Sequence, residues 1–204
     1  MKTQSFKLIS ILAASMAIAG CSNEASPQDT FWASLAAQCG NAFQGELTEG
    51  SENARASFGS QEMIMHVRHC TDDQIQVPFH VGENRSRTWI FTRLDDGSLR
   101  LKHDHRHEDG SEDTITMYGG TTAATGTMTA QEFPADEESI TMFAAGVAES
   151  PGLAGAEFNV WTVEVDDASF AFQLTRTNDP ELRFRVEFDL AAPVAAPPAA
   201  WGHE

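Results

Sequence analysis

Hydrophobic and polar residues alternate through most of this chain, which is the pattern of β-strands that bury one face. The clearest example is LRFRVEFDL, residues 182–190, where Phe184, Val186 and Phe188 alternate with charged residues. Successive side chains of a strand point to opposite faces, so this stretch predicts a strand with one dry and one wet face. The same period of two recurs in residues 63–70, 75–81, 87–94, 99–107, 114–118, 126–133, 159–165 and 169–176.

Two stretches depart from this period and predict helices. In TFWASLAAQCG, Phe31, Trp32 and Leu35 share one helical face, and Asp29 or Thr30 can cap its start. The segment ADEESITMFAAGV predicts a second, weaker helix. Because helices do not alternate with strands, a parallel α/β fold is excluded.

The pattern predicts an all-β domain, a single antiparallel barrel of about 8–10 strands with a short N-terminal helix. Closure of a barrel pairs every strand edge, and the helix can cover one open end. A two-sheet β-sandwich is the alternative, because alternation alone does not distinguish the two. The barrel architecture is similar to that of the calycins, which include the lipocalins, although a G-x-W lipocalin signature is absent. Such an analogy concerns the fold and says little about function.

The first 20 residues have the features of a bacterial export signal. A positively charged start precedes an apolar run from Leu8 to Ala19 that is too short to span a bilayer. The run ends in IAGC, which resembles the lipobox of bacterial lipoproteins. The resemblance implies cleavage after Gly20 and a lipid anchor on Cys21, and Ser22 implies sorting to the outer membrane, facing the periplasm. A plain secretory signal with an incidental cysteine is the alternative.

These features divide the chain into four parts. Residues 1–20 are the predicted lipoprotein signal peptide, and residues 21–29 a lipidated flexible tether. Residues 30–190 form the predicted β domain. Residues 191–204 are rich in proline and alanine and predict a disordered tail.

The chain is strongly acidic, with 13 basic and 30 acidic residues and a formal net charge of −17. Loss of residues 1–20 removes two lysines and no acidic residue, which brings the charge to −19. Such a surface repels nucleic acid and anionic headgroups, so we expect no nucleic-acid partner. The expected link to a lipid bilayer is the N-terminal acyl anchor.

Cysteine usage agrees with an oxidising compartment. If Cys21 is acylated, Cys39 and Cys70 remain, and the cell envelope favours a disulfide between them. The alternative, a pair of redox-active or metal-binding thiols, lacks a C-x-x-C spacing.

Several unusual strings occur in order between residues 31 and 190. They include CGNAF, MHVRHC, VPFHVGENRSRTWIFTR, LKHDHRHEDGSED, TMYGG, QEFPAD, NVWTVEV and RFRVEFDL. Together they resemble a family of uncharacterised bacterial lipoproteins or secreted proteins. The resemblance implies an exported protein and carries over no activity.

A run of histidines is the first candidate site. In LKHDHRHEDGSED, His103, His105 and His107 occupy alternate positions and share a strand face with Leu99 and Leu101. Imidazoles arranged in this way are common ligands of transition metals, so the three histidines are candidate metal ligands. The alternative is the polar end of a strand, with histidines that bind water and carboxylates.

The same region also resembles part of a cupin motif. His105, His107, Glu112 and Gly119 have nearly the spacing of the first motif, but a second motif needs another histidine downstream. Only His203 in the tail follows. The cupin resemblance therefore implies an incomplete site.

The barrel interior is the second candidate site. Met63, Met65, Trp89 and Phe91 lie on inward faces and are candidates to line a small-ligand site. The polar segment from Glu83 to Arg87 is either a solvated loop or a place where an anionic group binds. Recognised catalytic motifs such as G-x-S-x-G and H-E-x-x-H are absent, so no catalytic residue is assigned.

The sequence thus favours a non-enzymatic envelope lipoprotein whose barrel binds a small ligand. A metal-binding protein or metalloenzyme centred on the three histidines is one alternative, and a transition metal would be its cofactor. A structural or interaction module of the envelope is the other. The pattern leaves the oligomeric state open.

Overall fold

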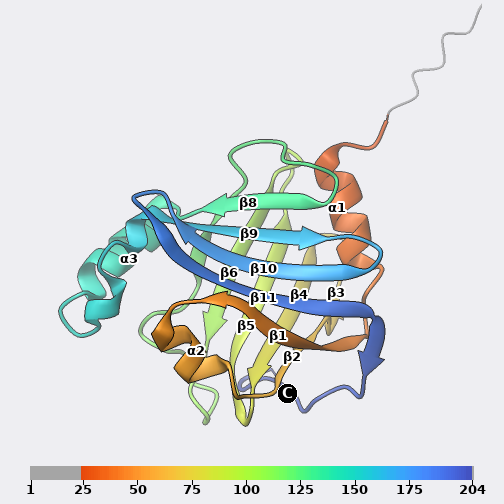
Figure 1. The fold of residues 1–204 in the computed structure, drawn as a ribbon. Coiled ribbons are helices and arrows are strands. Elements are labelled where there is room, and N and C mark those ends of the chain that lie inside the picture. The colour runs from red at the N-terminus through yellow and green to blue at the C-terminus, as the bar shows by residue number, and fades with distance from the viewer. Residues whose placement is uncertain (1–23, 204) are drawn as a thin grey trace, which may run out of the picture.

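Ten antiparallel strands wind into one nearly closed barrel in the computed structural model, which describes residues 24–203 (Figure 1). The strand order is β7-β6-β5-β4-β2-β1-β11-β10-β9-β8, and a short β3 pairs only with β4. The strands are β1 (Ala42–Gly50), β2 (Met63–His66), β3 (His69–Cys70), β4 (Gln74–Val81), β5 (Asn84–Arg93), β6 (Leu99–His105), β7 (Tyr118–Thr121), β8 (Ala130–Pro134), β9 (Asn159–Val165), β10 (Ser169–Arg176) and β11 (Asp179–Val194). The predicted barrel is confirmed, and the sandwich alternative is wrong because all strands belong to one continuous sheet.

The barrel closes where β7 approaches the end of β8. The backbone N–H of Asp136 donates to the carbonyl of Gly119 at 2.9 Å. A Cβ atom on Gly120 would lie 1.7 Å from the carbonyl oxygen of Pro134. Only glycine permits so close an approach of two backbones, so Gly120 allows the two edges to meet.

Within residues 24–203, three α-helices and two short 3₁₀ turns accompany the strands. They are α1 (Pro27–Ala36), α2 (Glu52–Phe58), α3 (Glu137–Gly146), η1 (Pro151–Leu153) and η2 (Ala156–Phe158). Figure 1 shows α1 at one end of the barrel and α2 toward the opposite end. None of the helices within residues 24–203 is long and apolar enough to cross a membrane.

Helix α1 closes one end of the barrel with the apolar face that the sequence predicts. Phe31, Trp32 and Leu35 are buried in the core. The helix begins earlier than predicted because Ser26 is its N-cap and forms a capping box with Asp29. Residues 27–29 of the predicted tether therefore belong to the helix. Residues 1–23, which include the predicted signal peptide and Cys21, lie outside the described residues.

The inward faces of the strands carry the alternating apolar residues. On β9, every second residue from Asn159 to Val165 is buried, including Trp161 and Val163. The same holds for Ile75, Val77, Phe79 and Val81 on β4, and for Leu99 and Leu101 on β6. Strand β1 and helix α2 were not predicted, because FQGELTEG is mostly polar and α2 buries no residue.

The C-terminal segment differs from the predicted disordered tail. Strand β11 extends to Val194, which pairs with Ala42 of β1. Beyond it, the N–H of Trp201 donates to the Arg85 carbonyl at 3.1 Å, and Ala200 is buried. The segment lies along the outside of the barrel because its backbone finds hydrogen-bond partners there. Composition alone could not indicate these partners.

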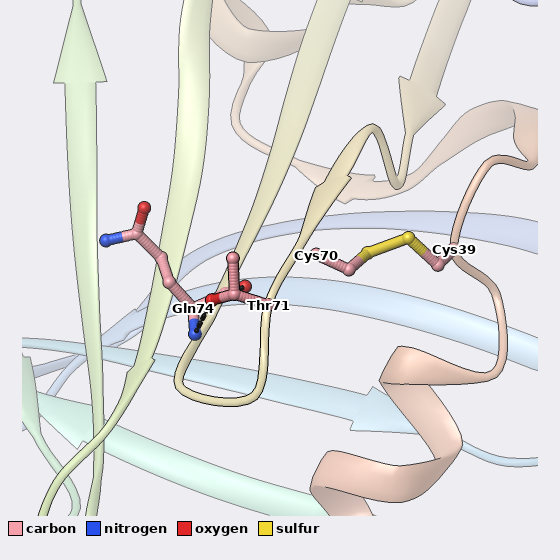
Figure 2. The surroundings of a disulfide bond; sticks show 4 residues. All are labelled: Cys39, Cys70, Thr71 and Gln74. Carbon is pink, nitrogen blue, oxygen red and sulfur yellow. Dashed lines mark hydrogen bonds between the residues drawn. A yellow bond between two sulfur atoms is a disulfide. The ribbon is translucent and has the colours of Figure 1, made fainter.

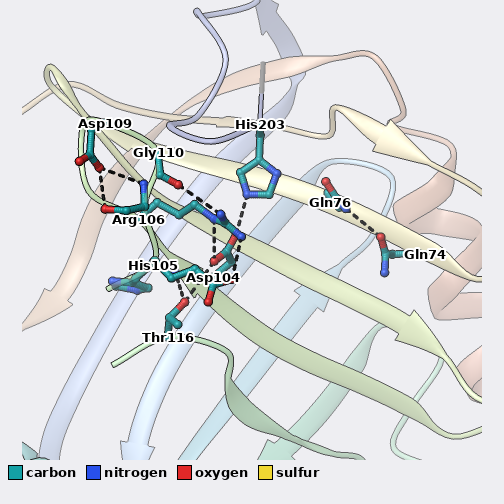
Figure 3. Close-up of polar contacts among 11 residues, drawn as sticks. Gln74, Gln76, Asp104, His105, Arg106, Asp109, Gly110, Thr116 and His203 are labelled. Atoms are coloured by element: carbon teal, nitrogen blue, oxygen red, sulfur yellow. Dashed lines mark hydrogen bonds and ion pairs between the residues drawn. The ribbon is translucent and has the colours of Figure 1, made fainter. Parts of the chain in front are cut away.

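The end of this segment covers part of the outer face of β6. His203 Nε2 lies 2.6 Å from Asp104 Oδ2, and Arg106 Nε donates to the same oxygen at 2.9 Å (Figure 3). Asp104 is 1% exposed as a result. Although Asp104 lies on the outward face of β6, the C-terminal segment covers it.

The predicted disulfide between Cys39 and Cys70 is confirmed (Figure 2). It joins the segment after α1 to the end of β3, next to the turn in which the N–H of Gln74 donates to the Thr71 hydroxyl at 3.0 Å. The bond therefore fastens the N-terminal helix segment to the barrel wall. The sequence separation of the two cysteines is 31.

Replacement of both cysteines by serine is expected to lower the free energy of unfolding by about 3–4 kcal/mol, because the unfolded chain regains the entropy of this loop. Urea unfolding of the double variant and of the oxidised wild type measures the difference. An unchanged unfolding midpoint would show that the bond does not stabilise the fold.

Candidate functional site

A cavity of about 330 Å³ lies between α2 and the inner faces of the barrel strands. Helix α2 is toward the end of the barrel opposite to α1 (Figure 1). Fifteen residues line it: Ser51, Ala54, Phe58, Phe79, Arg87, Trp89, His103, His105, Tyr118, Trp161, Phe172, Leu174, Leu182, Arg183 and Phe184. None of them is acidic, and the apolar members are mostly aromatic.

The register of three neighbouring strands places the polar residues of the cavity. Arg87 on β5 pairs with His105 on β6, and Trp89 pairs with His103 two residues further along. His103 in turn pairs with Tyr118 on β7. Because every second side chain points inward, these five side chains form a continuous patch on the inner wall.

The aromatic wall is built around Trp89. Its ring stacks on Phe79 with centroids 4.8 Å apart and on Phe172 at 4.4 Å. The interplanar angles are 14° and 9°. Two strands from one side of the barrel and one from the other thus contribute to a stack of aromatic rings.

His103 is held as a neutral imidazole. Its Nδ1–H donates to the Tyr118 carbonyl at 3.1 Å, so Nε2 carries the lone pair. Burial, followed by the neighbouring His105, lowers the pKa of His103 to about 3. Nε2 is buried and has no hydrogen-bond partner among residues 24–203. It is therefore an unsatisfied hydrogen-bond acceptor in the wall of the cavity.

His105 and Tyr118 form a second uncharged pair. The Tyr118 hydroxyl lies 3.0 Å from His105 Nε2. Burial, followed by the charge of Arg87, lowers the pKa of His105 to about 4, and burial raises the pKa of Tyr118 to about 12. Both side chains are therefore neutral near pH 7.

The structure brings two of the three candidate metal ligands together. His103 and His105 line the cavity, but β6 ends at His105 and His107 is exposed. The alternation stops there because the chain turns, with the His107 N–H donating to the Ser111 carbonyl at 2.8 Å. Residues 24–203 hold no group of three or more His, Cys, Asp or Glu side chains placed to bind a metal ion.

Of the four predicted ligand-lining residues, Trp89 lines the cavity. Met63, Met65 and Phe91 are buried in the core but do not line it. Phe91 points inward one step beyond Trp89 and packs against Phe133, with ring centroids 6.2 Å apart. Periodicity identifies inward residues, but not which of them stay uncovered by other side chains.

Arg87 is the main residue whose position sequence reasoning missed. The sequence predicts either a solvated loop or an anion-binding segment from Glu83 to Arg87, but β5 already begins at Asn84. Arg87 lies two residues before Trp89, so the period of two places it on the same inward face. That spacing was the signal available in the sequence.

No family model, curated protein or solved structure matches this chain. The function is therefore inferred from the geometry of the cavity.

Proposed function

We propose that the barrel binds a small, mainly apolar molecule in the cavity beneath α2. The observation that carries the proposal is the cavity itself, whose volume of about 330 Å³ and aromatic wall suit such a ligand. Small-molecule sites are typically concave, about 300–1,000 Å³ in volume, and mostly apolar with a few polar groups. The cavity is at the small end of that range, which favours a ligand of modest size.

The chemistry of the inner wall supports binding rather than catalysis. His103, His105 and Tyr118 are uncharged, and their hydrogen bonds to one another fix their orientation. The stacked rings of Trp89, Phe79 and Phe172 offer a rigid surface to an apolar body.

Helix α2 is the proposed route of access. It joins β1 to β2, and only Ala54 and Phe58 turn a partly covered side chain toward the barrel. Phe58 packs on Phe184 with ring centroids 5.1 Å apart. A helix with so few contacts can move at a small energetic cost, which opens the cavity to solvent.

The cellular setting that we propose is the bacterial envelope. It is supported by the lipobox-like IAGC sequence before residue 22 and by the disulfide between Cys39 and Cys70. A lipid on Cys21 would anchor the barrel to a membrane, facing the periplasm if the anchor is in the outer membrane. The barrel would then meet ligands that pass through that compartment.

Replacement of Leu174 by tryptophan tests the site, because the larger side chain fills the cavity that Leu174 lines. Binding of the neutral dye N-phenylnaphthylamine, followed by its fluorescence, is expected to be saturable in the wild type and about tenfold weaker or more in Leu174→Trp. Met128→Trp is the matched control, since Met128 is 59% exposed and lies outside the cavity. Equal binding by all three proteins would mean that the dye binds elsewhere.

A further inference from the structure

Arg87 is a cation that the cavity wall leaves without an acidic partner. Its Nη1 donates to Asn84 Oδ1 at 3.1 Å, and its guanidinium carbon lies 5.6 Å from the centre of the Phe58 ring. Among residues 24–203, no carboxylate oxygen lies within 4.0 Å of it. The remaining donors of its planar fork are therefore available to another molecule.

Arg87 differs from the arginines that pair with acidic residues. Within residues 24–203, Arg93, Arg106, Arg183 and Arg185 each lie within 4.0 Å of a carboxylate oxygen, whereas Arg87 does not although it lines the cavity. Charged groups that leave bulk water are normally paired, because removal of their hydration is costly. Burial lowers the pKa of Arg87, and no nearby carboxylate opposes that effect.

The only formal charges on the residues that line the cavity are positive. His105 and Tyr118 are neutral, so the formal charges on the lining belong to Arg87 and Arg183 alone. Arg183 lies at the rim, where its side chain is 53% exposed and 3.9 Å from Glu49. One end of the cavity is therefore cationic, and the stacked rings around Trp89 form its apolar wall.

We propose that the ligand is an anionic amphiphile, whose single negatively charged head binds the Arg87 guanidinium while its apolar body lies against Trp89 and Phe172. This inference rests on the proposed function, since it names the class of ligand that the same cavity takes. A carboxylate or a phosphate head would meet the same donors, because the guanidinium fork binds either group through two parallel hydrogen bonds.

Displacement of bound N-phenylnaphthylamine by ligands with the same ten-carbon chain tests the charge preference. The probes are decanoate, decyl phosphate, decanol and decyltrimethylammonium, each below its micelle-forming concentration. We expect decanoate or decyl phosphate to bind about ten- to hundredfold more tightly than decanol, which is the range for a hydrogen bond to a charged group. Decyltrimethylammonium is expected to bind most weakly, and the tighter of the two anions identifies the head group.

The preference for anions should depend on Arg87. In Arg87→Gln we expect the affinities for decanoate and decyl phosphate to fall to that for decanol, while the affinity for decanol itself stays the same. In Arg87→Lys, which keeps the charge but not the fork, we expect part of the preference to remain. Arg68→Gln is the matched control, because it removes the same charge from an exposed residue outside the cavity and should change nothing.

The possible failures are distinguishable. If the wild type binds decanol and decanoate equally, or if Arg87→Gln keeps the preference, the anionic ligand is refuted while small-ligand binding stands. If neither the dye nor any probe binds, the proposed function fails together with the inference. If Arg87→Gln does not fold, the wild-type ranking and the Arg87→Lys variant still decide the question.

Discussion

Acidification from pH 6.5 to pH 4 is expected to lower the free energy of unfolding by about 3 kcal/mol for each of two buried histidines, His80 and His103. Both are 4% exposed. Burial, together with the charge of Arg85, lowers the pKa of His80 to about 4, and burial lowers that of His103 to about 3. The fold therefore keeps both imidazoles neutral at pH values at which they are protonated in the unfolded chain.

The direction of this change in stability follows from whether the folded or the unfolded state binds the protons. Above pH 6.5 both states hold the histidines neutral, and the full stability is present. Below that value the unfolded chain binds protons that the fold does not, so stability falls as the pH drops toward the folded-state pKa values. The expected slope is about 1.4 kcal/mol per pH unit for each histidine.

Urea unfolding at a series of pH values from 7.5 to 4 measures this slope. The variants His80→Gln and His103→Phe should each flatten the curve, because each removes one titration, while those of His66 and His105 remain. His69→Gln is the control, since His69 is exposed. A slope that neither variant changes would assign the acid sensitivity to other groups.

Replacement of Asp104 by alanine is expected to cost about 3 kcal/mol of stability and to release the C-terminal segment. Asp104 accepts from Arg106 Nε at 2.9 Å and from the Thr116 hydroxyl at 3.1 Å, and it binds His203 Nε2 at 2.6 Å (Figure 3). Removal of one partner from a buried pair typically costs 3–5 kcal/mol. We expect the lower end because the Arg106 and His203 side chains are 24% and 19% exposed.

Two measurements separate the loss of stability from the loss of the contact. Chemical unfolding gives the change in stability, and amide hydrogen exchange at Trp201 and His203 reports whether the segment detaches. Asp95→Ala is the control, because Asp95 is exposed and lies in a turn. Unchanged exchange at Trp201 in Asp104→Ala would show that the carboxylate does not hold the segment.

Asp104 loses its contribution below the interval from pH 6.5 to 4 in which the histidines are tested. Burial alone would raise the pKa of Asp104, but the hydrogen bonds from His203 and Arg106 outweigh it and hold the pKa at about 2. Its contribution is therefore present above pH 3.8 and is lost as the pH falls through 2. Destabilisation between pH 6.5 and 4 reports the histidines instead.

The barrel could be predicted from the sequence because the alternation of apolar and polar residues is a local pattern. Phe184, Val186 and Phe188 specify an inward face whatever the rest of the chain does, and their burial confirms the pattern. Strand β1 could not be found in this way. Its Gly45 packs so closely on Phe188 that a Cβ atom would lie 2.5 Å from the ring, and this fit depends on the partner strand.

The cavity was only partly predictable for a related reason. Alternation places Trp89, His103 and His105 on inward faces. Whether they line a cavity depends on how seven strands and α2 pack around them. The sequence likewise identifies a Pro/Ala-rich terminus without showing that Arg85 and Asp104 hold it. Contacts between residues far apart in the chain, such as Arg85 with Ala199, are set by barrel closure rather than by local pattern.

Calorimetric titration of the protein with N-phenylnaphthylamine at several temperatures tests most directly whether the barrel holds a small-ligand site. Burial of apolar surface in the cavity predicts one saturable site per chain and a negative change in heat capacity, both lost in Leu174→Trp and kept in Met128→Trp. Heats without saturation, or the same saturable binding in Leu174→Trp, would contradict a binding site among the aromatic rings around Trp89.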